Sequence, residues 1–294
     1  VLNGASVSNV TISNSLIAVG LMPHSTGSLI ISSEQDPSVT TSSVSLHHNL
    51  WAHNHHRNPW VKDVERIQIV NNVMYNWKGN VGKITDGTTA DVIGNTFRAG
   101  PWTFNNQRES RIFHHDTVGA LSSVFVEGNV AQPLQPSPAG DQRVFVKYQA
   151  GGGVIPSQAF VSSRLTAPRF GIDEEPAAVA FDRVLSDVGA SRRLACNGEW
   201  TAARDDLDAE IVSHVWNNAG PAVDEGLDHP DDFGGAPNLA AGTPCVDRDE
   251  DGMPDAFEDR FGLDASDPTD VSGDPDGDGY TNIEEYVNGT VPRQ

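Results

Sequence analysis

L-H-H-N-L-W-A-H-N-H-H-R-N-P-W-V-K, the sequence of residues 46–62, decides the fold of this chain. It begins as a strand, with apolar Leu46, Leu50 and Trp51 on either side of Asn49. It ends in a polar, cationic run that contains Arg57, Pro59 and Lys62. We interpret the stretch as one coil of a parallel β-helix that displays Arg57.

The same pattern occurs five times in the first half of the chain: apolar, any, apolar, any, any, Asn, any, then an apolar or small residue. The five segments are residues 10–17, 44–51, 67–74, 90–97 and 124–131. Their sixth positions are Ser15, Asn49, Asn72, Asn95 and Asn129, separated by 34, 23, 23 and 34 residues. A repeat of about 20–50 residues is typical of a solenoid. Stacked coils would place the Asn side chains in one column, where each amide can donate and accept. An ordinary β-sandwich with coincidental Asn residues is the alternative.

The rest of the chain predicts smaller elements after this solenoid. We expect a β-helix with flanking loops over residues 1–175, a helical cap over 176–220, a linker over 221–246 and a tail over 247–294. A first helix starts at Pro176 and ends at Gly189, since Pro is favoured at a helix start and Gly at its end. A second helix covers residues 201–217, and its residues Leu207, Ile211 and Val215 form one apolar stripe.

Charge is distributed unevenly along the 294 residues. The net charge is −21; residues 247–294 hold fifteen acidic and three basic residues, whereas residues 1–135 hold nine and eight. No basic stripe is present, which argues against nucleic-acid binding, and no apolar run is long enough to predict a membrane span. A polyanion would be repelled by the tail but not by the nearly neutral solenoid with its local cations.

The tail contains two copies of the spacing of an EF-hand calcium loop, in which positions 1, 3, 5, 7, 9 and 12 supply oxygen ligands. The candidate ligands are Asp247, Asp249, Asp251, Met253, Asp255 and Glu258, then Asp274, Asp276, Asp278, Tyr280, Asn282 and Glu285. Met253 and Tyr280 would contribute their carbonyl oxygens, and a glycine before each permits the sharp turn. So many acids packed together repel one another without a cation, so we predict Ca²⁺ here. A disordered acidic tail is the alternative, and a calcium sensor is not expected because no helix pair opens onto a groove.

Two parts of the chain resemble known families. H-H-N-L-W-A-H-N-H-H-R-N-P-W-V-K with the following I-V-N-N-V-M-Y-N-W resembles the pectate lyases of polysaccharide lyase family 1, over roughly residues 1–230. That family carries an Arg-x-Pro-x-x-Arg motif, which here begins at Arg57 and ends in Lys62 instead of Arg. The tail resembles the EF-hand-like, thrombospondin type 3-like calcium repeats of secreted bacterial enzymes.

The resemblance implies a right-handed parallel β-helix and calcium-dependent β-elimination of polygalacturonate. Arg57 would be the base, and Lys62, His24 and Lys83 would bind substrate. The family often places a substrate-binding Lys in the loop that corresponds to residues 20–30, and this chain has none there. A guanidinium is normally protonated, so Arg57 needs neighbouring positive charge or desolvation to accept a proton. Activity is then expected to favour alkaline pH.

The resemblance also implies a secreted, monomeric protein. We expect the substrate-bridging calcium ligands to lie before Val1, in a longer parent chain that carries the signal peptide. In an exported protein, Cys196 and Cys245 most simply form one disulfide. Two free buried thiols are the alternative.

Three other functions are weighed against the lyase. A glycoside hydrolase of the same fold needs a pair of carboxylates beside the scissile bond, and no such pair lies on the Arg57 coil. A non-catalytic carbohydrate-binding protein would keep the solenoid and the tail without needing both Arg57 and Lys62. A zinc site would use the histidines of the same stretch, although adjacent residues such as His47 and His48 point to opposite faces of a strand. The histidines are His47, His48, His53, His55 and His56.

Overall fold

The computed structural model describes residues 6–34, 36–105, 113–116, 120–132, 142–148, 157–165, 172–222, 228–237 and 242–292. The chain divides into two compact units, Val1–Gly189 with Asp206–Pro237, and Ala190–Asp205 with Asn238–Gln294. These boundaries do not follow the four segments expected from the sequence, because residues 190–205 group with the tail and residues 206–237 with the solenoid. Each unit is described by itself.

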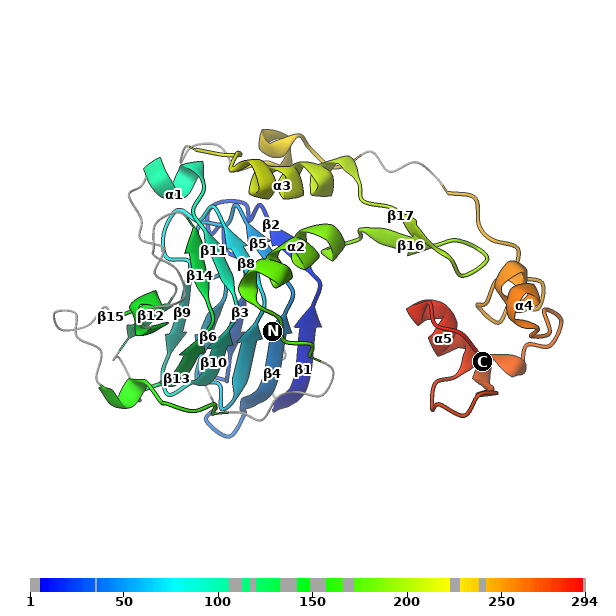
Figure 1. The fold of residues 1–294 in the computed structure, drawn as a ribbon, viewed down its shortest axis with the longest axis horizontal. Coiled ribbons are helices and arrows are strands. Elements are labelled where there is room, and N and C mark those ends of the chain that lie inside the picture. Colours follow the sequence, from blue (N-terminus) through cyan, green and yellow to red (C-terminus); the bar gives the residue numbers. More distant parts are fainter. Residues whose placement is uncertain are drawn as a thin grey trace. The chain divides into compact units, whose positions relative to one another are not determined.

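Three five-stranded sheets make up most of the first unit (Figure 1). The first contains β1 (Val7–Ser13), β4 (Thr41–His47), β7 (Ile67–Val70), β10 (Thr89–Ile93) and β13 (Ser123–Glu127). The second contains β2 (Leu16–Ala18), β5 (Leu50–Ala52), β8 (Val73–Tyr75), β11 (Thr96–Arg98) and β14 (Val130–Gln132). The third contains β3 (Leu29–Ile31), β6 (Trp60–Lys62), β9 (Gly82–Thr85), β12 (Phe113–Asp116) and β15 (Val146–Tyr148). Each strand pairs in parallel with the strand that follows three places later, so the described residues form the predicted parallel solenoid.

The repeat that the sequence presented as one strand is two strands joined by a bend. In the second coil, β4 ends at His47, β5 begins at Leu50, and His48 between them has a left-handed backbone with φ of 54°. The residue before the repeated Asn position is left-handed in all five coils. These residues are Asn14, His48, Asn71, Gly94 and Gly128. The apolar positions of the repeat therefore belong to two different sheets, and the Asn marks the corner between them.

The predicted column of Asn side chains is confirmed. The Nδ2 atoms of Asn49 and Asn72 each donate to the Oδ1 of the next Asn at 3.0 Å, and Asn95 donates to Asn129 at 2.9 Å. The same amide groups also donate to carbonyl oxygens of the preceding coil, for example Asn72 to Leu46 at 2.9 Å. All four side chains are buried. Their polar groups are satisfied, as burial requires.

The second sheet is buried on both faces. Trp51, Met74 and Phe97 point inward to the core of the solenoid. Their neighbours point outward, because successive strand residues face opposite sides, and among them Leu50 and Tyr75 pack against two helices. These helices are α2 (Ala177–Asp187) and α3 (Asp206–Asn217), and Figure 1 shows them beside β2, β5 and β8. The helices expected to cap the solenoid thus cover the flank of this sheet.

The prediction of a helix from residue 201 was wrong at its start. Residues 200–202 form strand β17 (Trp200–Ala202), which pairs antiparallel with β16 (Arg192–Leu194). Helix α3 begins only at Asp206. The apolar stripe of the helix is present: Ile211 and Val215 are buried against the second sheet, and Leu207 is partly buried beside them.

The second unit contains the β16–β17 hairpin and the tail. Cys196 and Cys245 form a disulfide, which confirms the predicted pairing. The tail contains α4 (Asp255–Phe261) and α5 (Asn282–Asn288), and a further short helix in the first unit is α1 (Pro101–Asn105). The 3-10 turns are η1 (Gln142–Phe145), η2 (Ser157–Ala159), η3 (Pro230–Phe233) and η4 (Asp270–Ser272). None of the helices in the described ranges has the length and apolar character needed to cross a bilayer.

Candidate active site and cation-binding loops

The backbone of Arg57 is held by the coils on either side of it. Ser28 donates its amide to the carbonyl oxygen of Arg57 at 2.7 Å, and Asn58 donates to the carbonyl of Val81 at 2.7 Å. Arg57 itself is left-handed, with φ of 64°. A Cβ atom at Gly27 would lie 2.6 Å from the Arg57 carbonyl oxygen, so only glycine fits this contact. The neighbouring coils thus fix the position of the Arg57 backbone, from which its side chain extends.

The side chain of Arg57 lies over Trp60, together with a lysine of the next coil. The guanidinium carbon of Arg57 is 4.9 Å from the centre of the Trp60 ring, and Nζ of Lys83 is 5.1 Å from it. Trp60 and Lys83 are register partners in β6 and β9. The ring is fixed by a hydrogen bond from its Nε1 to Oγ1 of Thr85 at 3.1 Å. Two cations on one aromatic ring are each attracted by its π-electrons, which offsets part of their mutual repulsion.

The surroundings of this pair are basic. His56, directly before Arg57, forms a parallel bridge with Thr26 of the preceding coil. Burial, followed by the positive charges of His55, Arg57, Lys83 and His24, lowers the pKa of His56 to about 4. No acidic group is among these causes. The structure therefore brings the predicted residues Arg57, Lys83 and His24 around one electropositive region, and the side chain of His24 is exposed.

Lys62, the fourth predicted residue of this site, is paired with acids. Its Nζ contacts the carboxylate of Glu34, and it lies 3.9 Å from Oδ2 of Asp86. The hydrogen bond to Glu34 raises the pKa of Lys62 above its ordinary value, with further contributions from the charges of Glu34 and Asp86. Lys62 lies two residues after Trp60 in β6 and so faces the same side of the sheet. A substrate carboxylate would have to displace Glu34 to reach it.

The histidines of the opening stretch form pairs. The left-handed turn at His48 brings its Nδ1 to 3.0 Å from that of His47, although alternation in a strand would separate them. His55 and His56 form a similar pair, with Nδ1 atoms 2.9 Å apart. No histidine joins a group of three candidate metal ligands in the part of the chain that the structure describes. The zinc alternative gains no support there.

The two loops of the tail fold alike. In the first, Gly252 donates its amide to Asp247 at 3.1 Å and Met253 donates to Asp251 at 2.7 Å. In the second, the equivalent bonds run from Gly279 to Asp274 at 3.1 Å and from Tyr280 to Asp278 at 2.9 Å. Both glycines are left-handed, with φ of 97° and 98°. In each loop the three aspartates gather so that one oxygen of each lies within 4.8 Å of the others; they are Asp247, Asp249 and Asp251, and Asp274, Asp276 and Asp278.

The glutamates at position 12 are buried with polar atoms that no donor satisfies. Glu258 is 0% exposed and Glu285 is 1% exposed. Both carboxylate oxygens of Glu258 and Oε2 of Glu285 lack a hydrogen-bond partner among the described residues. Burial, followed by the charges of Asp249, Asp251 and other neighbouring acids, raises the pKa of Glu258 to about 7. Buried, unpaired carboxylates are costly unless a cation neutralises them, so both loops fit a hard divalent cation with oxygen ligands.

Position 9 differs between the two loops. Asp255 turns to Arg248, whose Nε donates to its Oδ2 at 2.6 Å, and is not part of the carboxylate group. Asn282 donates its Nδ2 to the carbonyl oxygen of Asp270 at 2.7 Å, and its Oδ1 is buried without a partner in the described chain. A carboxylate that the spacing did not indicate, Asp270, lies with Asp251 and Glu258 within 4.8 Å.

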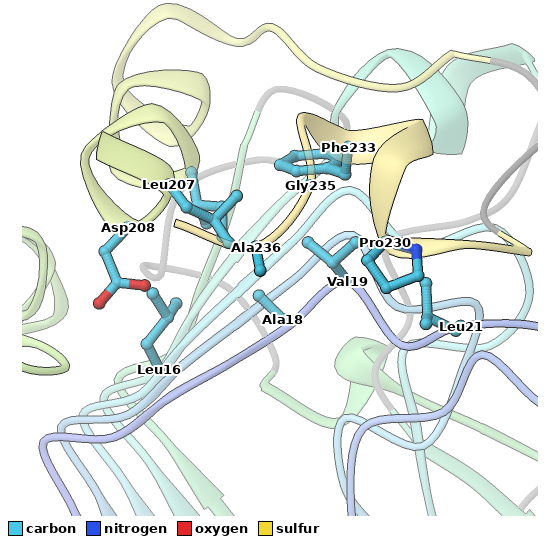
Figure 2. Close-up of a pocket in the computed structure, with 11 residues that line it drawn as sticks. Leu16, Ala18, Val19, Leu21, Leu207, Asp208, Pro230, Phe233, Gly235 and Ala236 are labelled. Atoms are coloured by element: carbon cyan, nitrogen blue, oxygen red, sulfur yellow. The ribbon is translucent and has the colours of Figure 1, made fainter. Parts of the chain in front are cut away.

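An apolar pocket lies on the flank of the solenoid (Figure 2). Its volume is about 270 Å³, and Leu16 and Val19 face Leu207 and Phe233 across it. Asp208 is the one charged residue among those that line it. It offers no cation to an acidic sugar, so it is not the substrate site suggested by Arg57.

Comparison with known proteins gives relatives but no family model that matches the chain. The chain is 33% identical to a probable pectate lyase C of Neosartorya fischeri, over 99% of this chain and 61% of the relative. It is 32% identical to proteins of the same name from Aspergillus fumigatus, over 99% and 61%, and from Aspergillus terreus, over 97% and 60%. The chain thus spans about three fifths of the length of these relatives. The similarity covers both the Arg57 region and the tail, since it extends over nearly the whole chain.

Proposed function

We propose that this chain is part of a pectate lyase, which cleaves polygalacturonate by β-elimination with Arg57 as the base. The observation that carries the proposal is the pair of cations, Arg57 and Lys83, held over Trp60 by successive coils, with the charge of His24 acting on the adjacent His56. Such a group matches the carboxylate carried by every residue of the substrate. The similarity to proteins named pectate lyase C supports the same reaction.

The proposed chemistry assigns one role to each cation. Lys83 and His24 bind sugar carboxylates, and carboxylate binding by a cation makes the proton at C5 more acidic. Arg57 accepts that proton, the C4–O bond breaks, and the electron pair of the C5–H bond forms the C4=C5 double bond. The leaving oxygen takes a proton from water. Nζ of Lys83 and the guanidinium of Arg57 lie over the same Trp60 ring, so the site places a second positive charge beside the proposed base.

Lys62 has a conditional role in this proposal. Its partner Glu34 must leave before Lys62 can bind a substrate carboxylate. An exposed ion pair of this kind contributes only about 0–1 kcal/mol, so a polyanion that makes several contacts can displace it. Lys62 then becomes a third binding cation, on the same face as Trp60.

Calcium enters the proposal through the tail. Ca²⁺ would be held in the first loop by Asp247, Asp249, Asp251, the carbonyl of Met253 and Glu258, and in the second by the equivalent residues. The support is the repeated loop geometry and the buried Glu258 and Glu285, which carry oxygens without a partner among the described residues. The proposed role is structural. Beside Arg57, the described residues contain no group of three acidic ligands, so no step of the cleavage is assigned to calcium, and calcium dependence of catalysis stays a prediction.

The proposed setting is extracellular. The disulfide between Cys196 and Cys245 is typical of an oxidising compartment. Polygalacturonate is also too large to enter a cell intact. A monomer is sufficient for the proposed site, since all of its residues come from one chain.

Two readouts on one reaction mixture test the function. The chain is incubated with polygalacturonate at alkaline pH while the ultraviolet absorbance of a 4,5-unsaturated uronide and the number of reducing ends are both followed. A lyase raises both in equal molar amounts. A hydrolase would create reducing ends without the absorbance, and a binding protein would raise neither while still retaining the polymer on a column. Either of these results would refute the proposal.

A further inference from the structure

Asp270 lies outside both twelve-residue loops in the sequence, yet its carboxylate lies beside two acidic residues of the first loop. It opens η4 (Asp270–Ser272), in the segment that joins the loops. One oxygen each from Asp270, Asp251 and Glu258 lie within 4.8 Å of one another. The EF-hand spacing does not include this residue, because it follows position 12 of the first loop by twelve residues.

The two oxygens of Asp270 have different surroundings. Oδ2 accepts the amide of Asp264 at 2.9 Å, which fixes the orientation of the carboxylate. Oδ1 is buried and has no hydrogen-bond partner among the described residues. The adjacent Glu258 is fully buried, and neither of its oxygens has a partner in the same range. Three carboxylates held this close repel one another unless a cation lies between them.

In the first loop, the residue at position 9 is bonded elsewhere, and Asp270 can take its place as a ligand. Asp255, which the spacing assigns to position 9, is engaged by both the amide and the guanidinium of Arg248, at 2.9 and 2.6 Å. The loop therefore lacks the oxygen that position 9 would supply, directly or through water. Asp270 approaches Asp251 and Glu258 from the neighbouring segment and supplies an oxygen in its stead.

The second loop holds Asp270 in place. Asn282 at position 9 of that loop donates its Nδ2 to the Asp270 carbonyl oxygen at 2.7 Å, and its own amide donates to Gly273 at 2.8 Å. We propose that Asp270 is a ligand of the first calcium ion, and that its bond from Asn282 couples the first loop to the second. This inference rests on the proposal that the tail binds calcium.

Calorimetric titration of the chelator-treated full chain with Ca²⁺ tests the role of Asp270. Calcium affinity depends on the number of charged ligands. Asp270→Asn is therefore expected to weaken calcium binding at one of the two sites by about tenfold or more. The matched control is Asp267→Asn, in the same segment. The side chain of Asp267 is exposed and, among the described residues, accepts bonds only from the amide and hydroxyl of Thr269, at 3.1 and 2.7 Å. The control is expected to bind calcium as the wild type does.

Two further variants separate ligation from folding and test the coupling. Asp270→Glu keeps the charge, so it is expected to bind calcium more tightly than Asp270→Asn; equal weakening in both variants would contradict a ligand role. Asn282→Ala is expected to weaken both sites, and an effect on one site alone would contradict the coupling.

The outcomes distinguish the two proposals. A wild-type chain that binds no calcium overturns the calcium assignment and the inference together. A wild type that binds two ions, beside an Asp270→Asn variant that binds them equally well, overturns only the role of Asp270. Unchanged circular dichroism of the variants shows that each comparison is made on folded protein.

Discussion

At the residue scale, Lys62 shows how one acidic neighbour can determine whether a cation is available to bind another carboxylate. Lys62 and Lys83 lie on adjacent strands of the third sheet, but among the described residues only Lys62 contacts acids, namely Glu34 and Asp86. Lys83 instead lies over Trp60 beside Arg57. Under the proposed function, a substrate carboxylate would meet Lys83 directly, whereas it would have to compete with Glu34 for Lys62.

This competition predicts that Glu34→Gln strengthens substrate binding. Removing the carboxylate leaves Lys62 available, and the loss of a pair worth about 0–1 kcal/mol is expected to lower the KM for polygalacturonate by about two- to fivefold. Initial rates over a range of substrate concentrations measure the change. The control is Glu65→Gln, another exposed acid of the solenoid, 3.7 Å from Arg66. A KM that is unchanged or raised in Glu34→Gln would mean that Lys62 does not bind the substrate.

His53 predicts how the stability of the chain depends on pH. The side chain of His53 is 0% exposed, and its Nδ1 accepts a hydrogen bond from Asn76. Its Nε2 lies 3.3 Å from Nδ1 of His214. Burial, followed by the charge of His214, lowers the pKa of His53 to about 3. The unfolded chain binds this proton near pH 6.5 and the folded chain only near pH 3, so the unfolded state gains protons first as pH falls. The free energy of unfolding is expected to decrease from pH 6.5 towards pH 3, by up to about 1.4 kcal/mol per pH unit from His53.

Urea unfolding at several pH values checks this expectation. His53→Gln is expected to reduce the slope between pH 6.5 and pH 3, because the group that gains a proton only on unfolding is gone. His229→Gln, which changes an exposed histidine, serves as the control. The explanation fails if the His53→Gln protein shows the same slope as the wild type.

At the scale of elements, the column of Asn side chains links successive coils. Each Asn in the column bonds to the next and to a carbonyl of the coil before it. The column was predictable, because spacings of 23 and 34 residues repeat along the sequence. The spacing of 23 also separates Trp60 from Lys83, so their contact could have been predicted from the same period.

Other elements could not be predicted from their sequence. The start of α3 at Asp206 depends on β17 pairing with β16, a contact between segments that no periodicity indicates. The pairing of Lys62 with Glu34 depends on the path of the segment between β3 and β4. Asp270 lies outside the loop template, and the capture of Asp255 by Arg248 depends on side-chain geometry.

The column predicts a large effect for Asn72→Ala. The substitution removes the bonds to Leu46, Asn49 and Asn95 and leaves buried polar groups unsatisfied, each of which costs about 1–3 kcal/mol. We expect the free energy of unfolding to fall by about 3 kcal/mol. Asn217→Ala, at an exposed position of α3, should change it by less than about 0.5 kcal/mol. Similar values for the two variants in chemical denaturation would show that the column does not stabilise the solenoid.

At the scale of the whole molecule, the chain consists of two units with different sources of stability. The solenoid unit has a continuous apolar core. The tail, by contrast, buries carboxylate oxygens of Glu258 and Glu285 that have no hydrogen-bond partner among the described residues, and a bound cation would neutralise them. The presence of calcium should therefore affect one unit far more than the other.

Removal of calcium is expected to lower the melting temperature of the second unit alone. A ligand that binds only the folded state stabilises it by mass action, so a chelator should shift one of two calorimetric transitions downward and leave the other in place. Addition of excess Ca²⁺ should reverse the shift. If the chelator moved both transitions equally, or neither, the tail would not be an independent calcium-stabilised unit.

The central claim is that Arg57 removes the C5 proton, and the initial rate of unsaturated uronide formation from polygalacturonate tests it most directly. Loss of a general base lowers the rate by about 10²–10⁴-fold, so we predict at least a hundredfold decrease for Arg57→Ala. Arg66→Ala, which removes an exposed arginine of the solenoid, should leave the rate unchanged. An Arg57→Ala protein that forms the unsaturated product at a rate close to that of the wild type would contradict the account.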